Sequence, residues 1–464
     1  MCDIMKKIFL FASMLLLLTT SSCNLYTHYK QPELSVVDSL YQRLPIDTTV
    51  ISVDNTSIGY MSWRAVFTDT LLQKWIERGL VHNTDLRIAQ LRVEQAEATL
   101  MQSRLAFMPS LNFSAQGGLN QYTGTELKTP FSLAVMADWE LDIFGKKLNN
   151  TWASQAVLEQ KRAYRQAVQT QLIATIADSY FTLLMLDEQL EISNRTLDTW
   201  EENIRTLEAL KRAGKTNEAA VLQAKASRLN VEGNVLTLER RIIEQENSLS
   251  VLLGMAPAML QRGKLSEQVF PEELSVGIPL QLLSFRPDVR QAEYALAEAF
   301  YKTNIAHANF YPSISLSGSA GWTNNGATIA NPVGWLLNAL GSLVQPLFNQ
   351  GKNMANLKIA EAQQEAALLL FRQSLLNAGA EVNNALVQWQ TARKRIDIGS
   401  KQIVNLQAAI WNTRLLMKHG GANYLEVLTA QQNLLQAELM QASDRYDEIQ
   451  GVISLFHALG GGVD

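Results

Sequence analysis

The chain has 464 residues, a formal net charge of -4 at pH 7, 47% hydrophobic residues and 18% charged residues. This composition excludes a disordered or collagen-like chain and favours ordered helix. The acidic balance gives no support for nucleic acid as a partner.

Residues 1–22 are typical of an export signal that ends at a cysteine. Two lysines precede the apolar run 8–18, which is shorter than the roughly 20 residues of a transmembrane helix. The segment 20–23, Thr-Ser-Ser-Cys, resembles a bacterial lipobox. We therefore expect lipidation of Cys23, and Asn24 fits sorting to an outer membrane. The alternative is an ordinary signal peptide, which would leave one unexplained thiol.

Residues 23–64 are expected to form a lipid-anchored extended segment, and two tandem copies of one unit follow it. Phe-Met-Pro-Ser-Leu at 107–111 recurs 203 residues later as Phe-Tyr-Pro-Ser-Ile, and Gly145-Lys146 recurs 206 residues later. A three-residue insertion therefore lies between these two motifs, in a loop, where insertions are tolerated. We place the first copy at 65–262, an equatorial linker at 263–283 and the second copy at 284–464.

Each copy contains a predicted β-hairpin, at 110–144 and at 313–349, because apolar and polar residues alternate there. Strands of about ten residues with one apolar face suit the wall of a transmembrane barrel. A hairpin packed on a soluble core is the alternative, but a rod-like helix offers no core at its end. Four strands cannot close a barrel, and open sheet edges are not tolerated in lipid. The chain must therefore oligomerise; two chains would supply eight strands and three would supply twelve.

Each hairpin follows shorter helical segments and precedes a long helix and a return helix. The predicted ranges are 145–212 and 217–254 in the first copy, and 351–418 and 423–459 in the second. At 1.5 Å per residue a long helix would extend about 100 Å. Apolar residues repeat every seven positions, which predicts narrow seams between adjacent helices. The seam of the first long helix is Leu183, Leu190, Leu197 and Ile204, and its match in the second copy is Trp389, Ile396, Ile403 and Ile410. The seam of the first return helix is Leu222, Leu229, Leu236 and Ile243, and its match is Leu428, Leu435, Ala442 and Ile449.

The sequence shows no motif typical of an enzyme active site. Residues 212–216 resemble the end of a P-loop, but the earlier glycine and the preceding strand that this motif requires are missing. The five histidines are scattered without metal-ligand spacing, and no pair of carboxylates stands out as an acid-base couple. We expect no enzyme activity, and no cofactor other than a covalent lipid on Cys23.

From residue 23 to its C-terminus the chain resembles the TolC-like outer membrane factors of the NodT/OprM type. The order of four features carries the resemblance: Cys23-Asn24-Leu25, the paired Pro-Ser strand starts, Arg286-Pro287-Asp288-Val289, and the glycine turns. The resemblance implies a mainly α fold with a transmembrane β-barrel. It also implies a homotrimer that forms a twelve-strand barrel in the outer membrane of a Gram-negative bacterium, above a long α-helical periplasmic tunnel with an equatorial belt.

The same resemblance implies a passive conduit for drugs, metals or other small molecules. Its partners would be a periplasmic adaptor, or membrane fusion protein, and an inner-membrane pump of the RND type. The residues that match the adaptor-docking tips are Gly214, Lys215, Asn217, Gly420, Gly421 and Asn423. Glu426 matches an acidic ring at the periplasmic aperture, with one carboxylate per chain. Asn423 and Glu426 also have capping-box spacing, and the two roles are compatible.

Three other functions are alternatives to efflux. The chain could be the exit channel of a type I protein secretion system, a lipid-anchored coiled-coil scaffold without a pore, or an envelope enzyme. Conduction of ions by an isolated oligomer would separate a channel from a scaffold. The cargo, the particular pump and adaptor, and the open or closed resting state do not follow from the sequence.

Overall fold

The computed structural model describes residues 26–32, 61–121, 123–124, 127–268, 286–324, 334–418 and 424–461. The signal segment and Cys23 lie outside these residues. The chain divides into two compact units. The strand unit comprises residues 1–33, 92–162 and 291–372, and the helix unit comprises 34–91, 163–290 and 373–464. The chain is mainly helical, as the sequence predicts.

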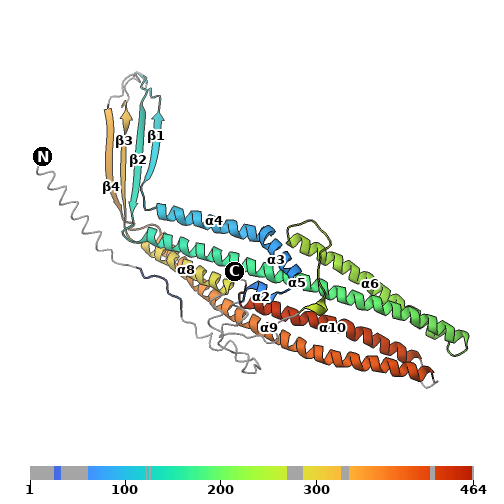
Figure 1. Ribbon diagram of the computed structural model, residues 1–464. Coiled ribbons are helices and arrows are strands. Elements are labelled where there is room, and N and C mark those ends of the chain that lie inside the picture. Colours follow the sequence, from blue (N-terminus) through green and yellow to red (C-terminus); the bar gives the residue numbers. More distant parts are fainter. Residues whose placement is uncertain are drawn as a thin grey trace. The chain divides into compact units, whose positions relative to one another are not determined.

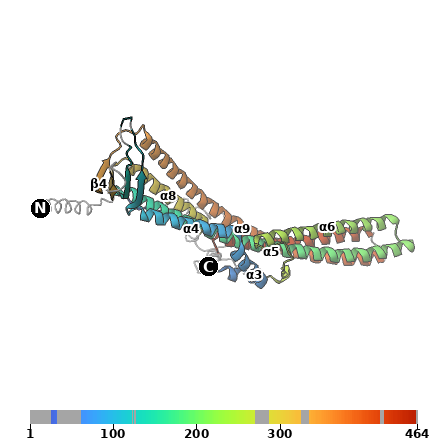
Figure 2. The same cartoon turned by 90° about the horizontal axis from the view of Figure 1, so that it is seen from above.

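Four long helices dominate the chain. They are α5 (Lys146–Arg212), α6 (Glu218–Leu252), α9 (Lys352–Lys418) and α10 (Tyr424–Ala458). Their ends fall within two residues of the ranges that the sequence indicates. Glycines with positive φ precede α5 and α9 and follow α5, which explains why the helices begin and end there. In both views α5 and α6 run side by side (Figures 1 and 2).

Short helices precede the strands in each copy. They are α2 (Trp63–Val66), α3 (Thr70–His82), α4 (Thr84–Leu105) and α8 (Pro287–Ala308), and a short 3-10 helix, η4 (Leu265–Glu267), lies in the linker. Asp69 caps α3, because its Oδ1 accepts from the Leu71 N–H at 2.7 Å. Asn83 separates α3 from α4 and accepts from the Leu86 N–H at 3.0 Å. None of the described helices is long and apolar enough to cross a membrane.

The strand unit contains one antiparallel sheet in the order β1-β2-β3-β4 (Figure 1). Its strands are β1 (Ser110–Gly117), β2 (Phe131–Leu141), β3 (Ser313–Thr323) and β4 (Gly334–Val344). The central pair, β2 and β3, joins the hairpins of the two copies, with Val135 opposite Ala320. Asn324 extends this pairing, since its Oδ1 accepts from the Phe131 N–H at 2.8 Å. The sheet is therefore continuous across both copies.

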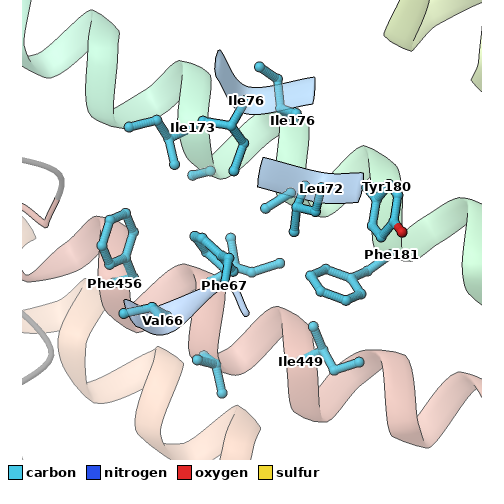
Figure 3. Packing of buried hydrophobic residues seen from close by; sticks show 14 of the residues in the cluster. Val66, Phe67, Leu72, Ile76, Ile173, Ile176, Tyr180, Phe181, Ile449 and Phe456 are labelled. Atoms are coloured by element: carbon cyan, nitrogen blue, oxygen red, sulfur yellow. The ribbon is translucent and has the colours of Figure 1, made fainter. Parts of the chain in front are cut away.

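The core of the helix unit is built where α2 and α3 pack against α5 and α10. Phe67, Leu72 and Ile76 are almost fully buried, and Figure 3 shows them among Ile173, Phe181 and Phe456. The rings of Phe67 and Phe456 lie edge to face, with centroids 5.5 Å apart. Residues of both copies thus share one core.

The predicted seam of α6 is wrong as a contact within the chain. Leu222, Leu229, Leu236 and Ile243 are 56–64% exposed. The buried stripe lies one residue earlier on the same helix and consists of Val221, Ala224, Val231, Val235, Leu238, Ile242 and Leu249. A spacing of seven is satisfied by several parallel stripes on one helix, so it predicts a seam without fixing which stripe meets α5.

A glycine in α10 allows close contact with α9. A Cβ on Gly451 would lie 2.9 Å from the backbone nitrogen of Trp389, and backbone cannot move aside cheaply. We expect Gly451→Ala to lower the free energy of unfolding by about 1–3 kcal/mol, measured as a fall in Tm. The control is Gly233→Ala in α6, where no atom lies within 4 Å and helix propensity should add about 0.5–1 kcal/mol. Equal Tm values for the two variants would contradict the close contact.

Candidate functional site

The turn between α5 and α6 brings three predicted tip residues together. Gly214 has a φ of +70°, and its N–H donates to the Lys211 carbonyl at 3.0 Å. The Lys215 N–H donates to the Leu210 carbonyl at 2.9 Å, which satisfies the end of α5. Asn217 then caps α6, since its Oδ1 accepts from the Ala220 N–H at 3.0 Å. The turn is therefore ordered by its own sequence.

Charged side chains surround this turn. Lys211 pairs with Glu218 across it, and Lys225 of α6 pairs with Glu208 of α5 at 2.8 Å. The hydrogen bond from Lys225 lowers the pKa of Glu208. Lys215 is exposed at the turn itself. In the second copy, Gly420, Gly421 and Asn423 lie outside the described residues, so their predicted docking role stays a prediction.

Behind the turn, a small apolar cluster joins three helices. Trp200 and Leu207 of α5, Val221 of α6, and Tyr424 and Val427 of α10 are all buried there. The Tyr424 hydroxyl has no hydrogen-bond partner among the described residues, and burial raises its pKa to about 12. The cluster supports the ends of the helices from inside.

A polar triad that the sequence analysis missed lies next to this cluster. Buried Asn203 of α5 donates from Nδ2 to Gln431 Oε1 of α10 at 3.0 Å. Arg414 of α9 donates to Asn203 Oδ1 at 3.3 Å. A buried amide in an otherwise apolar seam is the sequence signal for such a contact, because it fixes the register of neighbouring helices.

Glu426 lies in the first turn of α10 and is exposed. Its neighbours Tyr424 and Val427 are buried in the apolar cluster. A carboxylate in this place is favoured by the positive end of the helix dipole. Its predicted capping partner, Asn423, is outside the described residues. The acidic ring therefore stays a prediction, with an exposed carboxylate available for it.

The register of the sheet gathers apolar residues on one face. Leu133 lies opposite Trp322, and Val135 lies between Phe113 and Ala320. The residues of this apolar face are Leu111, Phe113, Ala115, Leu133, Val135, Ala137, Trp139, Leu141, Ile314, Leu316, Gly318, Ala320, Trp322, Leu337, Ala339, Gly341 and Leu343. Leu111, Phe113 and Leu337 are at least 70% exposed. A continuous apolar surface of this kind marks contact with a membrane or a protein.

The opposite face of the sheet is mainly polar. Asp138 and Glu140, the two acidic residues in the strands, both lie on it. The other polar residues there are Ser110, Asn112, Ser114, Gln116, Ser132, Ser313, Ser315, Ser317, Ser319, Thr323, Asn338 and Ser342. The alternation seen in the sequence thus becomes two chemically different faces across all four strands.

Residues 26–32 pack against the helices of the strand unit. The His28 ring lies 4.2 Å from the Trp152 ring of α5, and the Tyr29 ring lies 5.9 Å from Phe300 of α8. The Tyr29 N–H donates to the Tyr301 hydroxyl at 3.3 Å. Burial is the main cause of the raised pKa of Tyr29. The chain that follows Cys23 is therefore held on the unit that contains the strands.

An arginine clamp in the helix unit was also missed in the sequence analysis. Arg262 binds both carboxylate oxygens of Asp187, at 2.5 and 2.9 Å, and Glu246 Oε1 at 2.5 Å. Arg262 lies 75 residues from Asp187 along the chain and partly covers its carboxylate. These carboxylates raise the pKa of Arg262. The clamp holds the chain after α6 against α5 and α6.

Arg286 of the second copy's opening motif forms a similar contact. It is buried, and it binds Asp288 and Glu381 at 2.7 Å and the Ala458 carbonyl at 2.7 Å. It therefore joins the starting end of α8 to α9 and the last turn of α10.

Within the described part of the chain, no group of three or more His, Cys, Asp or Glu side chains could hold a metal ion.

Comparisons with known proteins agree with this architecture. A family model described as "Outer membrane efflux protein" matches residues 75–255 and 278–461. "Cation efflux system protein CusC" of Escherichia coli K12 is 30% identical over 449 residues, which cover 96% of this chain and 97% of CusC. "Probable outer membrane lipoprotein SilC" of Salmonella typhimurium is 29% identical over 86% of this chain and 88% of SilC.

A solved structure shows the same fold. The MtrE outer membrane channel of Neisseria gonorrhoeae, in its open state, matches with a TM-score of 0.84 and 28% identity, over 94% of this chain and 98% of MtrE. The family match spans both copies and most of the chain. The chain therefore belongs to the outer membrane efflux protein family.

Proposed function

We propose that the chain is the outer membrane channel of a tripartite efflux system and works as a homotrimer. Membership of the family makes it a transport component of the outer membrane. The apolar face of the four-stranded sheet is the observation that carries the finer proposal. That face would contact lipid, while the polar face would line a water-filled lumen, as in transmembrane β-barrels.

The edges of the sheet are the reason for the oligomer. Strands β1 and β4 each pair on one side only among the described residues. A free edge in lipid leaves backbone N–H and C=O groups unpaired at several kcal/mol each. Pairing β4 of one chain with β1 of the next removes these edges. Three chains would then give a twelve-strand barrel, on a tunnel formed by α5, α6, α9 and α10.

Lipidation of Cys23 would anchor the trimer to the same membrane. Three observations support this lipidation. They are the lipobox-like segment 20–23, the packing of residues 26–32 on the strand unit, and the similarity to SilC, which is described as a probable outer membrane lipoprotein. The signal segment 1–22 would be removed beforehand. Acyl chains contribute about 0.8 kcal/mol per buried CH₂, so a multiply acylated cysteine would hold firmly.

The helix turns are the proposed contact for a periplasmic adaptor that connects the channel to an inner-membrane RND pump. Gly214, Lys215 and Asn217 form an ordered and exposed turn. Energy would come from the pump, and the channel would be passive. CusC is named for cation efflux, and we propose ions or small molecules, rather than proteins, as the cargo.

Two measurements test this function. The purified full-length protein should form a heat-stable oligomer that conducts ions across planar lipid bilayers. Deletion of the gene should increase sensitivity to metal ions or drugs and leave the secreted proteome unchanged. A non-conducting oligomer would support a scaffold instead, and loss of secreted proteins would support type I secretion.

Glu426 should contribute to the narrow end of the channel. Three copies of an exposed carboxylate around one axis would bind cations in a narrow aperture, and the bound cations would slow the passage of other ions. We expect Glu426→Gln to raise single-channel conductance and lower cation selectivity in planar bilayers. Glu218→Gln, in the first turn of α6, is the matched control because Glu218 already pairs with Lys211. Equal conductance in wild type and Glu426→Gln would remove the ring and leave Glu426 only a role at the helix end.

A further inference from the structure

A hollow in the helix unit lies between α5, α9 and α10. It measures about 950 Å³ and is open to solvent. Three of the residues that line it, Ala174, Ala385 and Ile453, are apolar and only 2–6% exposed. Polar side chains line the rest, among them Asp178 of α5 and Asn384 of α9. Sites for drug-sized molecules are hollows of about 300–1,000 Å³ that combine apolar surface with a few polar groups.

Both copies of the repeat contribute equivalent positions to this hollow. Asp178 of α5 corresponds to Asn384 of α9, because the two residues are 206 positions apart. Thr175 and Glu381 are related by the same offset, and both also line the hollow. The two long helices therefore present matching positions that differ in charge.

The hollow lies on the side of α5 that faces away from α2 and α3. These short helices share a core with Ile173 and Ile176 of α5, which Figure 3 shows beside Leu72 and Ile76. At 3.6 residues per turn, Thr175 and Asp178 point in roughly the opposite direction from Ile173 and Ile176. A tunnel formed by α5, α6, α9 and α10 must keep its lumen clear. Helices α2 and α3 would therefore lie outside the tunnel, and the hollow would open into the lumen.

Asp178 brings a negative charge that forms no ion pair with another described residue. Its Oδ1 accepts from the Tyr446 hydroxyl at 2.8 Å and from Gln450 Nε2 at 3.2 Å, and both donors are neutral. These bonds hold the carboxylate in place without cancelling its charge. Asp187 of the same helix differs, because Arg262 binds it. Since a charge that is partly removed from water is normally paired, a bound cation would complete the environment of Asp178.

The other ionisable groups at the hollow do not supply a compensating positive charge. Glu381 binds Arg286 at 2.7 Å, but Arg286 also binds Asp288 at 2.7 Å, so that one arginine faces two carboxylates. His457 lines the hollow too. Burial and then the charge of Arg286 lower the pKa of His457, which leaves its ring neutral at pH 7. The excess charge around the hollow is therefore negative and favours a cation.

We propose that the hollow binds an amphiphilic organic cation, with its positive group beside Asp178 and its apolar body against the three apolar lining residues. This inference rests on the proposed channel and names organic cations of drug size as a class of cargo. A metal ion matches the hollow less well, because no group of His, Cys, Asp or Glu in the described chain could hold one. Each chain of the trimer would present one such site to the lumen, near the end of α10.

Binding of ethidium, a fluorescent organic cation, tests the site in purified full-length protein in a non-ionic detergent. Fluorescence anisotropy gives the Kd of wild type and variants. We expect Asp178→Asn to weaken ethidium binding by about tenfold or more, because the contact between opposite charges is lost. The matched control is Asp198→Asn, which removes the same charge from an exposed position of α5 outside the hollow. This control should keep the wild-type Kd.

A charge exchange separates the charge of Asp178 from any structural role of this residue. Asp178→Asn combined with Asn384→Asp moves the carboxylate to the matching position of α9, in the same hollow. We expect this double variant to bind ethidium more tightly than Asp178→Asn alone. Wild-type binding by Asp178→Asn, an equal loss in the control, or no recovery in the double variant would each overturn the site.

Two further measurements test the class of ligand and separate the site from the channel. Displacement of ethidium by Zn²⁺ at lower concentration than by tetraphenylphosphonium would overturn the organic cation as the ligand. Planar-bilayer conductance is measured on the same preparations. Conduction without Asp178-dependent binding of ethidium removes this site and keeps the channel. Asp178-dependent binding by a protein that does not conduct keeps the site and removes the channel.

Discussion

Val135→Arg is expected to prevent stable insertion of the protein into the outer membrane. Val135 lies at the middle of β2 on the apolar face, between Phe113 and Ala320. If this face contacts lipid, an arginine near the bilayer midplane costs about 2–4 kcal/mol in each chain. At 1.4 kcal/mol per factor of ten, this cost lowers the equilibrium constant for insertion by about 30- to 700-fold for each chain.

The adjacent residue supplies the control for this prediction. Met136 is also apolar and partly exposed, but it points to the polar face, opposite Asn112 and Ser319. Met136→Arg should therefore insert and form heat-stable oligomers at close to the wild-type level. The measurement is the amount of oligomer in outer membrane fractions. Equal loss in both variants would show that the sheet does not present one face to lipid and the other to water.

Arg262→Met is expected to destabilise the helix unit strongly. The substitution leaves Glu246 buried without its cationic partner, and removes both hydrogen bonds to Asp187. Breaking a buried ion pair from one side costs about 3–5 kcal/mol. Asp187 is partly exposed, so water compensates some of this loss, and we expect the lower part of that range. The cost should appear as a lower denaturant midpoint for unfolding.

Two further variants show whether the unpaired charge of Glu246 causes this destabilisation. Arg205→Met on α5 removes an exposed pair with Glu201 and should change the free energy of unfolding by less than about 1 kcal/mol. Arg262→Met combined with Glu246→Gln should recover part of the stability, because the amide carries no charge to bury. If the single and double variants were equally unstable, the loss would come from packing of the arginine stem, not from the charge.

The local sequence pattern was sufficient to predict the helices and strands and their order along the chain. Helix ends were predicted to within two residues because glycines in left-handed conformation, such as Gly145 and Gly214, punctuate otherwise uninterrupted helical sequence. The strands followed from a period of two, which places alternate residues on opposite faces without knowledge of any partner. The turn at Gly214, Lys215 and Asn217 is also local, since it satisfies its own backbone groups. The docking role of these residues came from the family resemblance and stays a prediction.

Side-chain contacts between residues far apart in the sequence could not be predicted from local pattern. The polar triad of Asn203, Gln431 and Arg414 joins residues more than 200 positions apart, and the Arg262 clamp joins residues 75 positions apart. Charged side chains are common on helix surfaces, so nothing in the local sequence separates Arg262 and Arg414 from solvated residues. An amide in an apolar seam, such as Asn203, indicates a polar contact but does not identify the partner. Only the packing of the helices shows which of them are buried together.

The sequence by itself determined the duplication, the helices, the alternating strands and the seven-residue spacing, because each depends on neighbours within a few residues along the chain. The tertiary structure decided the order of the strands, and that the stripe beginning at Val221, rather than the one at Leu222, faces α5. Several stripes on a helix share one spacing, and burial on one side by a partner is what distinguishes them.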